Sequence, residues 1–152
     1  MPTAGKLETL WINTQERWLR RMDRPGTLAP HLATGLRGEL AALFELRRRG
    51  VVVVARRWTS PKMRGDIDLI AWDGTCLCFV EVKTRTARDM RPAELAVDED
   101  KREMIRGLAR TYLHAFPESE RRTIPIRFDV ISVYAIDAAN EFEIFRGAFG
   151  WR

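Results

Sequence analysis

The feature that most constrains this chain is an apolar strand that carries an acid and a base, Phe79-Val80-Glu81-Val82-Lys83. Alternate side chains of a strand point to opposite faces, so Glu81 and Lys83 share one face while the two valines share the other. A second segment, residues 65–70 (GDIDLI), places Asp68 just before another apolar stretch. A purely structural plan would not put charged groups at these positions, and they are therefore candidates for chemistry.

The surrounding pattern predicts an α/β chain with the element order α-α-β-β-β-α-β-β. Hydrophobic spacing predicts helices over 6–22, 35–49 and 99 to about 116. β-branched and alternating runs predict strands over 51–57, 66–72, 75–84, 126–134 and 141–146, with polar loops at 58–64 and 85–96. Asp73-Gly74 is typical of a short hairpin, and Asp98 is a good N-cap for the third helix.

This order predicts a mixed sheet, in which an antiparallel meander is followed by a crossover helix and a further strand. A length of 152 residues fits one domain. We place that domain at 31–152 and treat residues 1–30 as an N-terminal helical extension and linker. The apolar stripe of the 6–22 helix could cover a sheet edge or mediate dimerisation, or the helix could pack on its own domain.

The charge of the chain favours a nucleic-acid partner. The 26 basic residues outnumber the 21 acidic ones, and only four of them are lysines: Lys6, Lys62, Lys83 and Lys101. Arginine binds phosphates through its planar fork and stacks on bases, although an arginine excess can also reflect genome composition. Two of the four lysines fall at candidate site positions, where a compact ammonium differs chemically from a guanidinium.

The same composition argues against several other classes of protein. Cys76 and Cys78 are one residue apart in an apolar run, and we expect both to be reduced core residues. No cluster of soft ligands predicts a zinc site. No stretch approaches the roughly 18 apolar residues of a membrane helix, and the first residues lack a signal-peptide pattern. We therefore expect a cytoplasmic protein without a membrane partner.

The hairpin brings the candidate acids together. If the turn at Asp73-Gly74 pairs Trp72 with Thr75, position 68 lies opposite 79, and a diagonal step brings Asp68 to Glu81 on the same face. Two hard carboxylates suit an oxygen-liganded divalent ion, Mg²⁺ (or Mn²⁺) before Zn²⁺. Such a pair is suited to metal-assisted phosphodiester hydrolysis, in which Lys83 could orient water or stabilise the transition state.

Two helical residues join this group. Glu39 lies on the apolar face of the 35–49 helix and could provide a further ligand, whereas Lys101, near the start of the third helix, could touch a phosphate. Structural alternatives stay open for every candidate. Glu81 and Lys83 could be an ion pair on an exposed edge, Asp68 a cap, Glu39 a partner of Arg37 or Arg57, Lys101 a solvated lysine, and Arg127 with Asp129 a structural pair.

Five blocks in this order resemble a known family. They are G-x-x-G-E (Gly35, Gly38, Glu39), G-D-I-D-L-I (65–70), F-V-E-V-K-x-R (79–85), Lys101 and R-F-D-V (127–130). Together they resemble the YraN-like family of small bacterial proteins. That family is regarded as a predicted endonuclease of the PD-(D/E)xK restriction-endonuclease-like superfamily, similar to archaeal Holliday junction resolvases. The likeness runs from about residue 35 to 134.

The resemblance implies a restriction-endonuclease-like three-layer α/β domain, whose central mixed sheet (αβββαβ core) is flanked by helices. It implies that Asp68, Glu81 and Lys83 are the catalytic core, with Glu39 as the helical acid and Asp68, Glu81 and Glu39 as metal ligands. Ile67 replaces the proline of the superfamily pattern, and Asp66 stands where relatives usually carry Glu, which makes it a distal phosphate or metal contact. We expect nucleic-acid contacts from Lys101, Arg85, Arg56, Arg57, Lys62 and Arg64.

The function that follows is a Mg²⁺-dependent endonuclease that hydrolyses DNA phosphodiester bonds, with branched, structured or single-stranded DNA as candidate substrates. By analogy with the resolvases we expect a homodimer. A different class is also open, namely a nucleic-acid-binding or accessory protein of DNA repair or recombination that keeps the nuclease fold without cutting. A third is a scaffold that joins partners through its N-terminal helix.

Overall fold

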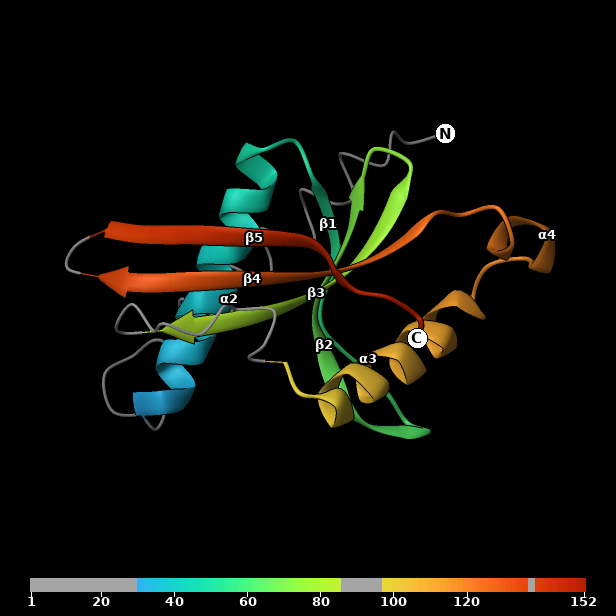
Figure 1. Cartoon of the computed structure of the whole chain (residues 1–152), viewed down its shortest axis with the longest axis horizontal. Helices are drawn as coiled ribbons and strands as arrows, with labels where there is room; N and C mark the ends of the chain where they lie inside the picture. The colour runs from blue at the N-terminus through green and yellow to red at the C-terminus, as the bar shows by residue number, and fades with distance from the viewer. Residues whose placement is uncertain (1–29, 86–96, 137–138) are drawn as a thin grey trace. The chain divides into compact units, whose positions relative to one another are not determined.

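The computed structural model describes residues 30–85, 97–136 and 139–152 (Figure 1). The compact unit of residues 38–152 is considered by itself. The elements are α2 (Pro30–Arg48), β1 (Val52–Ser60), β2 (Met63–Asp73), β3 (Cys76–Arg85), α3 (Glu99–Leu113), α4 (Glu118–Arg121), β4 (Ile126–Ile136) and β5 (Ala139–Phe149). The predicted 6–22 helix and nearly all of the 85–96 loop lie outside the described residues, and the domain boundary at residue 30 stays a prediction.

The five strands form one mixed sheet in the order β1-β2-β3-β4-β5. β1, β2 and β3 are an antiparallel meander, β4 runs parallel to β3, and β5 returns antiparallel to β4. Helix α3 lies between β3 and β4 in the chain, since a parallel pair needs a long crossover connection. This arrangement confirms the predicted α/β class and its mixed sheet.

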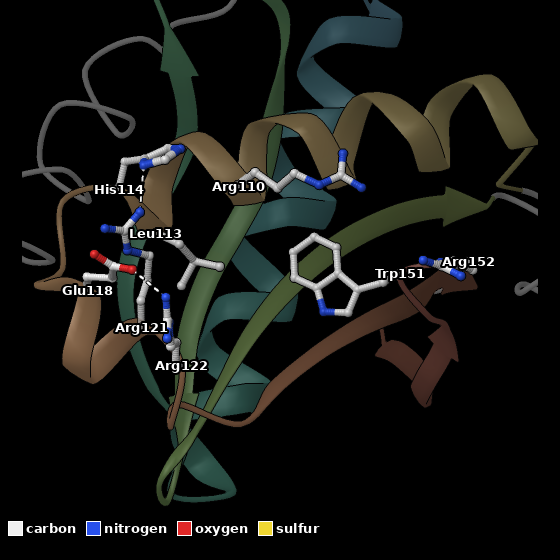
Figure 2. A pocket seen from close by; sticks show the side chains of 8 residues that line it. All are labelled: Arg110, Leu113, His114, Glu118, Arg121, Arg122, Trp151 and Arg152. Carbon is white, nitrogen blue, oxygen red and sulfur yellow. Dashed lines mark hydrogen bonds and ion pairs between the residues drawn. The ribbon is translucent and has the colours of Figure 1, made fainter.

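Helices cover both faces of this sheet. Asp98 caps α3 by accepting a hydrogen bond from the Lys101 N–H, and the apolar stripe of α3 buries Ile105 and Leu108 in a core with Phe79 and Phe128. Buried strand residues of the opposite parity, such as Val80 and Ile131, lie outside that core. The part of α2 from residue 38 buries Leu43 and Leu46, and it lies behind the sheet in both views (Figures 1 and 2). The layers are therefore helix, sheet and helix.

Several predicted boundaries were wrong. The predicted loop 58–64 is mostly strand, because Trp58 and Thr59 suit a strand and only Pro61 and Lys62 are needed for the turn to Met63. Helix α2 begins at Pro30 instead of residue 35, which is consistent with the preference of proline for a first helical turn. The last strand, predicted over 141–146, is almost twice as long. Helix α3 ends at Leu113 rather than 116.

The register of the central hairpin also differs from the prediction. Asp73 pairs with Cys76, so the turn residues are Gly74 and Thr75, and Gly74 takes the positive φ of 61° that favours glycine. The pairing is shifted by two residues from the predicted one, and Ile70 faces Phe79. A shift of two keeps every side chain on its predicted face, because the strand period is two.

Among the described residues, no helix combines the length and the apolar character needed to cross a bilayer.

Candidate functional site

The candidate acids lie where two neighbouring strands separate. The β2–β3 ladder runs from Asp73 and Cys76 to Leu69 and Val80 and ends there, although both strands continue. Beyond this point β2 stays paired with β1 and β3 with β4, and Figure 1 shows β2 and β3 diverging. Continuing the register places Asp68 opposite Glu81, at the opening of this fork. The two acids are therefore direct cross-strand neighbours, instead of the diagonal pair that was predicted.

The Asp68 side chain completes the hydrogen bonding of the fork. Its Oδ2 accepts a hydrogen bond of 2.7 Å from the Val82 N–H, a donor that the interrupted ladder would leave without a partner. Asp68 is 7% exposed. The pKa of Asp68 is raised to about 8, chiefly by burial and then by the neighbouring Glu81 carboxylate, with a smaller increase from Glu39, while the Val82 hydrogen bond opposes the increase. The Asp68 and Glu81 carboxyl groups are close enough to interact directly.

Two lysines converge on Glu81, which is 4% exposed. Lys83 Nζ lies 3.2 Å from Glu81 Oε1, and Lys101 Nζ of α3 lies 3.4 Å from Oε2. Oε2 is buried and has no hydrogen-bond partner in the part of the chain that the structure describes. Two half-buried ammonium groups therefore face the Glu81 side chain without saturating its oxygens. Lys101, predicted as a phosphate contact, lies at the acid pair itself.

Helix α2 brings a third acid to the region through a close approach to β3. A Cβ on Gly38 would collide with Oγ1 of Thr84, so only glycine lets the helix come this near. The next residue, Glu39, is 8% exposed, and burial raises its pKa, while Arg57 and then Arg56 oppose the increase. Glu39 also interacts electrostatically with Glu81. The predicted helical acid is thus buried and close to the pair.

Arg57 lies between Glu39 of α2 and Asp66 of β2. Its Nε lies 3.6 Å from Glu39 Oε2 and 3.7 Å from Asp66 Oδ2. Arg57 has a φ of 44°, a left-handed conformation that is strained for a residue with a side chain. One of the structural alternatives weighed from sequence, an ion pair between Glu39 and Arg57, is therefore present. Asp66 contacts Arg57 rather than the acid pair.

The acids of the fork offer oxygen ligands for a metal ion. In the described ranges 30–85, 97–136 and 139–152, no group of three or more His, Cys, Asp or Glu side chains has the geometry to hold one. The Asp68–Glu81 pair fits a divalent cation as a two-carboxylate site, because it offers hard oxygen ligands and a buried Glu81 oxygen without a hydrogen-bond partner. Glu39 does not join them in a three-ligand cluster.

The remaining predicted nucleic-acid contacts are spread around the fork. Arg56 is buried, at 9% exposure, and interacts electrostatically with Glu39. Lys62 and Arg64 are exposed at the β1–β2 hairpin, and Arg85 is half-buried at the end of β3. Of the predicted contacts, Lys101 is the one placed at the acid pair by a measured distance, 3.4 Å from Glu81 Oε2. Their role stays a prediction.

One residue near the site was not foreseen. Ser132 pairs with Lys83 in the β3–β4 ladder and shares its face. Its hydroxyl oxygen is buried and has no hydrogen-bond partner among the described residues. The strand pattern of 126–134 could not single it out, because only the register between β3 and β4 places it beside Lys83. It provides a further polar group on the site face.

Comparison with known proteins places these residues in a family context. The model of a family described as Uncharacterised protein family UPF0102 matches residues 38–133. A UPF0102 protein of Koribacter versatilis is 45% identical over 119 residues, covering 78% of this chain and 80% of its own. Relatives from Solibacter usitatus (43% over 112 residues; 74% and 82%) and Desulfosudis oleivorans (37% over 115 residues; 76% and 88%) are similar. The matched region includes the whole fork.

Proposed function

The protein belongs to the uncharacterised protein family UPF0102, which confirms the YraN-like resemblance, and we propose that it is a metal-dependent endonuclease that hydrolyses phosphodiester bonds of DNA. The observation that carries this proposal is the buried Asp68–Glu81 pair at the fork, with Lys83 and Lys101 facing Glu81. Buried acids in contact with raised pKa values are frequent in catalytic sites. Branched or single-stranded DNA is the substrate class that the resemblance implies, and a homodimer stays a prediction.

The residues of the fork would divide the chemistry between them. Asp68 and Glu81 would hold the divalent cation, which when bound supplies charge neutralisation for the phosphoryl group and a lowered pKa for water. The Val82 hydrogen bond fixes the orientation of the Asp68 carboxyl. The Lys83 ammonium, 3.2 Å from Glu81, can orient a water molecule or donate to a phosphate oxygen in the transition state.

A DNA cleavage assay tests this proposal. Purified protein is incubated with single-stranded, duplex, flap and four-way DNA, with Mg²⁺, with Mn²⁺ and with chelator, beside the variants Glu81→Gln, Glu81→Ala and Lys83→Ala. Glu143→Gln is the matched control, since the Glu143 side chain is exposed on β5 and accepts a hydrogen bond from Tyr134. We expect cation-dependent cutting that is lost in the site variants and kept in the control. Cutting that survives Glu81→Ala would come from a contaminant and would contradict the proposal.

A second function is favoured by a specific observation, the neutralisation of Glu81 by two lysines together with the absence of a three-ligand cluster in the described residues. A carboxylate held in this way needs no cation for stability. The protein would then be a non-catalytic nucleic-acid-binding or accessory protein of DNA repair or recombination. Tight DNA binding in chelator, without cutting of any substrate by wild-type protein in Mg²⁺ or Mn²⁺, would favour this alternative.

A further inference from the structure

A basic hollow lies at the opposite end of α3 from the acid pair. It has a volume of about 700 Å³ and is bounded by α3, α4 and the segment after β5. We call it the Arg–Trp pocket and define it by the lining residues Arg110, His114, Arg121, Arg122, Trp151 and Arg152 (Figure 2). Lys101 and Arg110 are nine residues apart on α3, which corresponds to about 14 Å along the helix axis.

The pocket carries a strong excess of positive charge. Four guanidinium groups line it against one acidic side chain, that of Glu118, which accepts a hydrogen bond of 2.5 Å from Arg122. Arg152 has no ion pair with a residue in the described part of the chain. A site with this balance attracts anions, and guanidinium groups match the geometry of phosphate oxygens.

Arg121 is held by a contact with His114, while its Nε–H group has no partner in the described residues. Its Nη1 lies 2.7 Å from Nδ1 of His114, and Figure 2 shows the two side chains meeting. Because a guanidinium has only donors, Nδ1 must accept, and the proton of the neutral ring lies on Nε2. The Nε of Arg121 is buried and has no hydrogen-bond partner among the described residues. A buried donor without a partner is costly, and an anionic ligand in the pocket would provide one.

The aromatic side of the pocket is fixed before any ligand binds. Trp151 is 37% exposed, and its ring meets Phe128 edge-on at a centroid distance of 4.8 Å. The Arg110 guanidinium carbon lies 5.3 Å from the Trp151 ring centroid. The buried Arg106 donates to the Gly150 carbonyl oxygen at 2.8 Å, which ties the segment before Trp151 to α3. A partly exposed indole that is anchored in this way is a preformed stacking surface.

We propose that the Arg–Trp pocket binds an unpaired stretch of nucleic-acid strand, with phosphates on its arginines and a base against Trp151. A positive groove combined with an aromatic platform is the arrangement that single-stranded nucleic acids use. A flexible single strand with unstacked bases can enter a concave pocket more readily than the stiff backbone of a duplex can. This inference rests on the proposed function in one respect, because the strand bound in the pocket would continue to the acid pair at the fork. At 3.4 Å per stacked nucleotide, the roughly 14 Å along α3 corresponds to about four nucleotides.

Equilibrium binding tests the pocket without relying on cleavage. A fluorescently labelled single-stranded DNA and a duplex of equal length are titrated in chelator with wild-type protein, Trp151→Ala, Trp151→Phe and Arg121→Gln/Arg122→Gln. Arg146→Gln is the matched control, because Arg146 is half exposed on β5 and lies near Asp73, outside the pocket. Thermal melting of each variant checks that it is folded, and Trp151→Phe keeps an aromatic ring if Trp151→Ala unfolds.

The expected result is a loss of single-strand affinity of roughly 5-fold to 150-fold for Trp151→Ala, with partial recovery in Trp151→Phe. The double arginine variant should reduce the slope of log affinity against log salt by about 1.4, for two lost phosphate contacts. Wild-type affinity for single strands in folded pocket variants would overturn the proposal, as would a loss confined to duplex binding.

The same variants separate this inference from the proposed nuclease function. Single-strand binding that depends on the pocket, in a wild-type protein that cuts no DNA, would support the pocket and reject the nuclease. Cation-dependent cutting that depends on Glu81, with folded pocket variants that bind and cut like wild type, would support the nuclease and reject the pocket. Failure of the wild-type protein to bind any nucleic acid would reject both.

Discussion

Glu81 and Asp129 lie on the neighbouring parallel strands β3 and β4, and each is 4% exposed. Asp129 accepts hydrogen bonds of 2.8 to 3.1 Å from the Arg127 guanidinium and a further one of 2.9 Å from the Gly147 N–H. Within the described ranges, Glu81 faces two ammonium groups at 3.2 and 3.4 Å beside the Asp68 carboxyl group, and one of its buried oxygens has no hydrogen-bond partner. Equal burial therefore accompanies two different roles: a saturated carboxylate that holds the fold, and an unsaturated one that is available to bind something else.

The largest expected difference between Glu81 and Asp129 is in their effect on DNA cutting. Glu81→Gln should reduce DNA cutting by roughly 10³-fold, because it removes the charge on which both lysines converge. The free energy of unfolding should change by about 1 kcal/mol or less, since half-buried Lys83 and Lys101 can turn to water. Initial rates on the preferred DNA and urea unfolding measure the two quantities. Cutting at the wild-type rate would show that Glu81 resembles Asp129.

The corresponding change at Asp129 should lower stability instead of activity. Asp129→Asn should lower the free energy of unfolding by roughly 3 kcal/mol, because it breaks a buried pair and leaves Arg127 partly uncompensated. Cutting per folded molecule should stay near the wild-type value. Asp73→Asn is the control, since Asp73 is one-third exposed and bonds the same guanidinium at 2.8 Å; its cost should be about 1 kcal/mol or less. Equal costs for the two variants would contradict the assigned difference.

Lys83, the partner of Glu81, should affect activity, whereas Arg127, the partner of Asp129, should affect stability. Lys83→Met should reduce cutting by roughly 10²-fold, the contribution typical of one proton-donating group. The matched variant Arg127→Met should leave cutting of the folded protein intact and lower the urea midpoint instead. Both variants are measured in the same two assays. A Lys83→Met protein that cuts normally but unfolds more readily would assign a structural role to Lys83.

A further expected effect is on the pH dependence of stability. The pKa of Asp68 is about 8 in the folded protein and lower when unfolded, so the folded state binds more protons between the two values. Stability from this group is complete below the unfolded pKa and is lost as the pH rises toward 8, by at most about 1.4 kcal/mol per pH unit. Urea unfolding at pH 5 and pH 8 should show this loss in wild type and less of it in Asp68→Asn. Identical pH dependence in both proteins would contradict a buried, protonated Asp68.

Local pattern was sufficient for most of the fold. The alternation in 79–83 placed Glu81 and Lys83 on one face, Asp98 was identified as the N-cap of α3, and Arg127 with Asp129 was weighed as a structural pair, as the structure has them. Boundaries were less predictable. The loop expected at 58–64 is mostly strand, because Trp58 and Thr59 suit a strand and the pairing of β1 with β2 continues through them.

The sequence by itself determined which residues carry charge within apolar strands, because the strand and helix periods depend only on local geometry. It could not determine where the β2–β3 ladder ends, that Lys101 reaches Glu81, or that Ser132 stands beside Lys83. Nor could it gather arginines from α3 and α4 with Trp151 into one hollow. These relations join residues far apart in the chain, and only the register of the sheet and the packing of α3 on it bring them together.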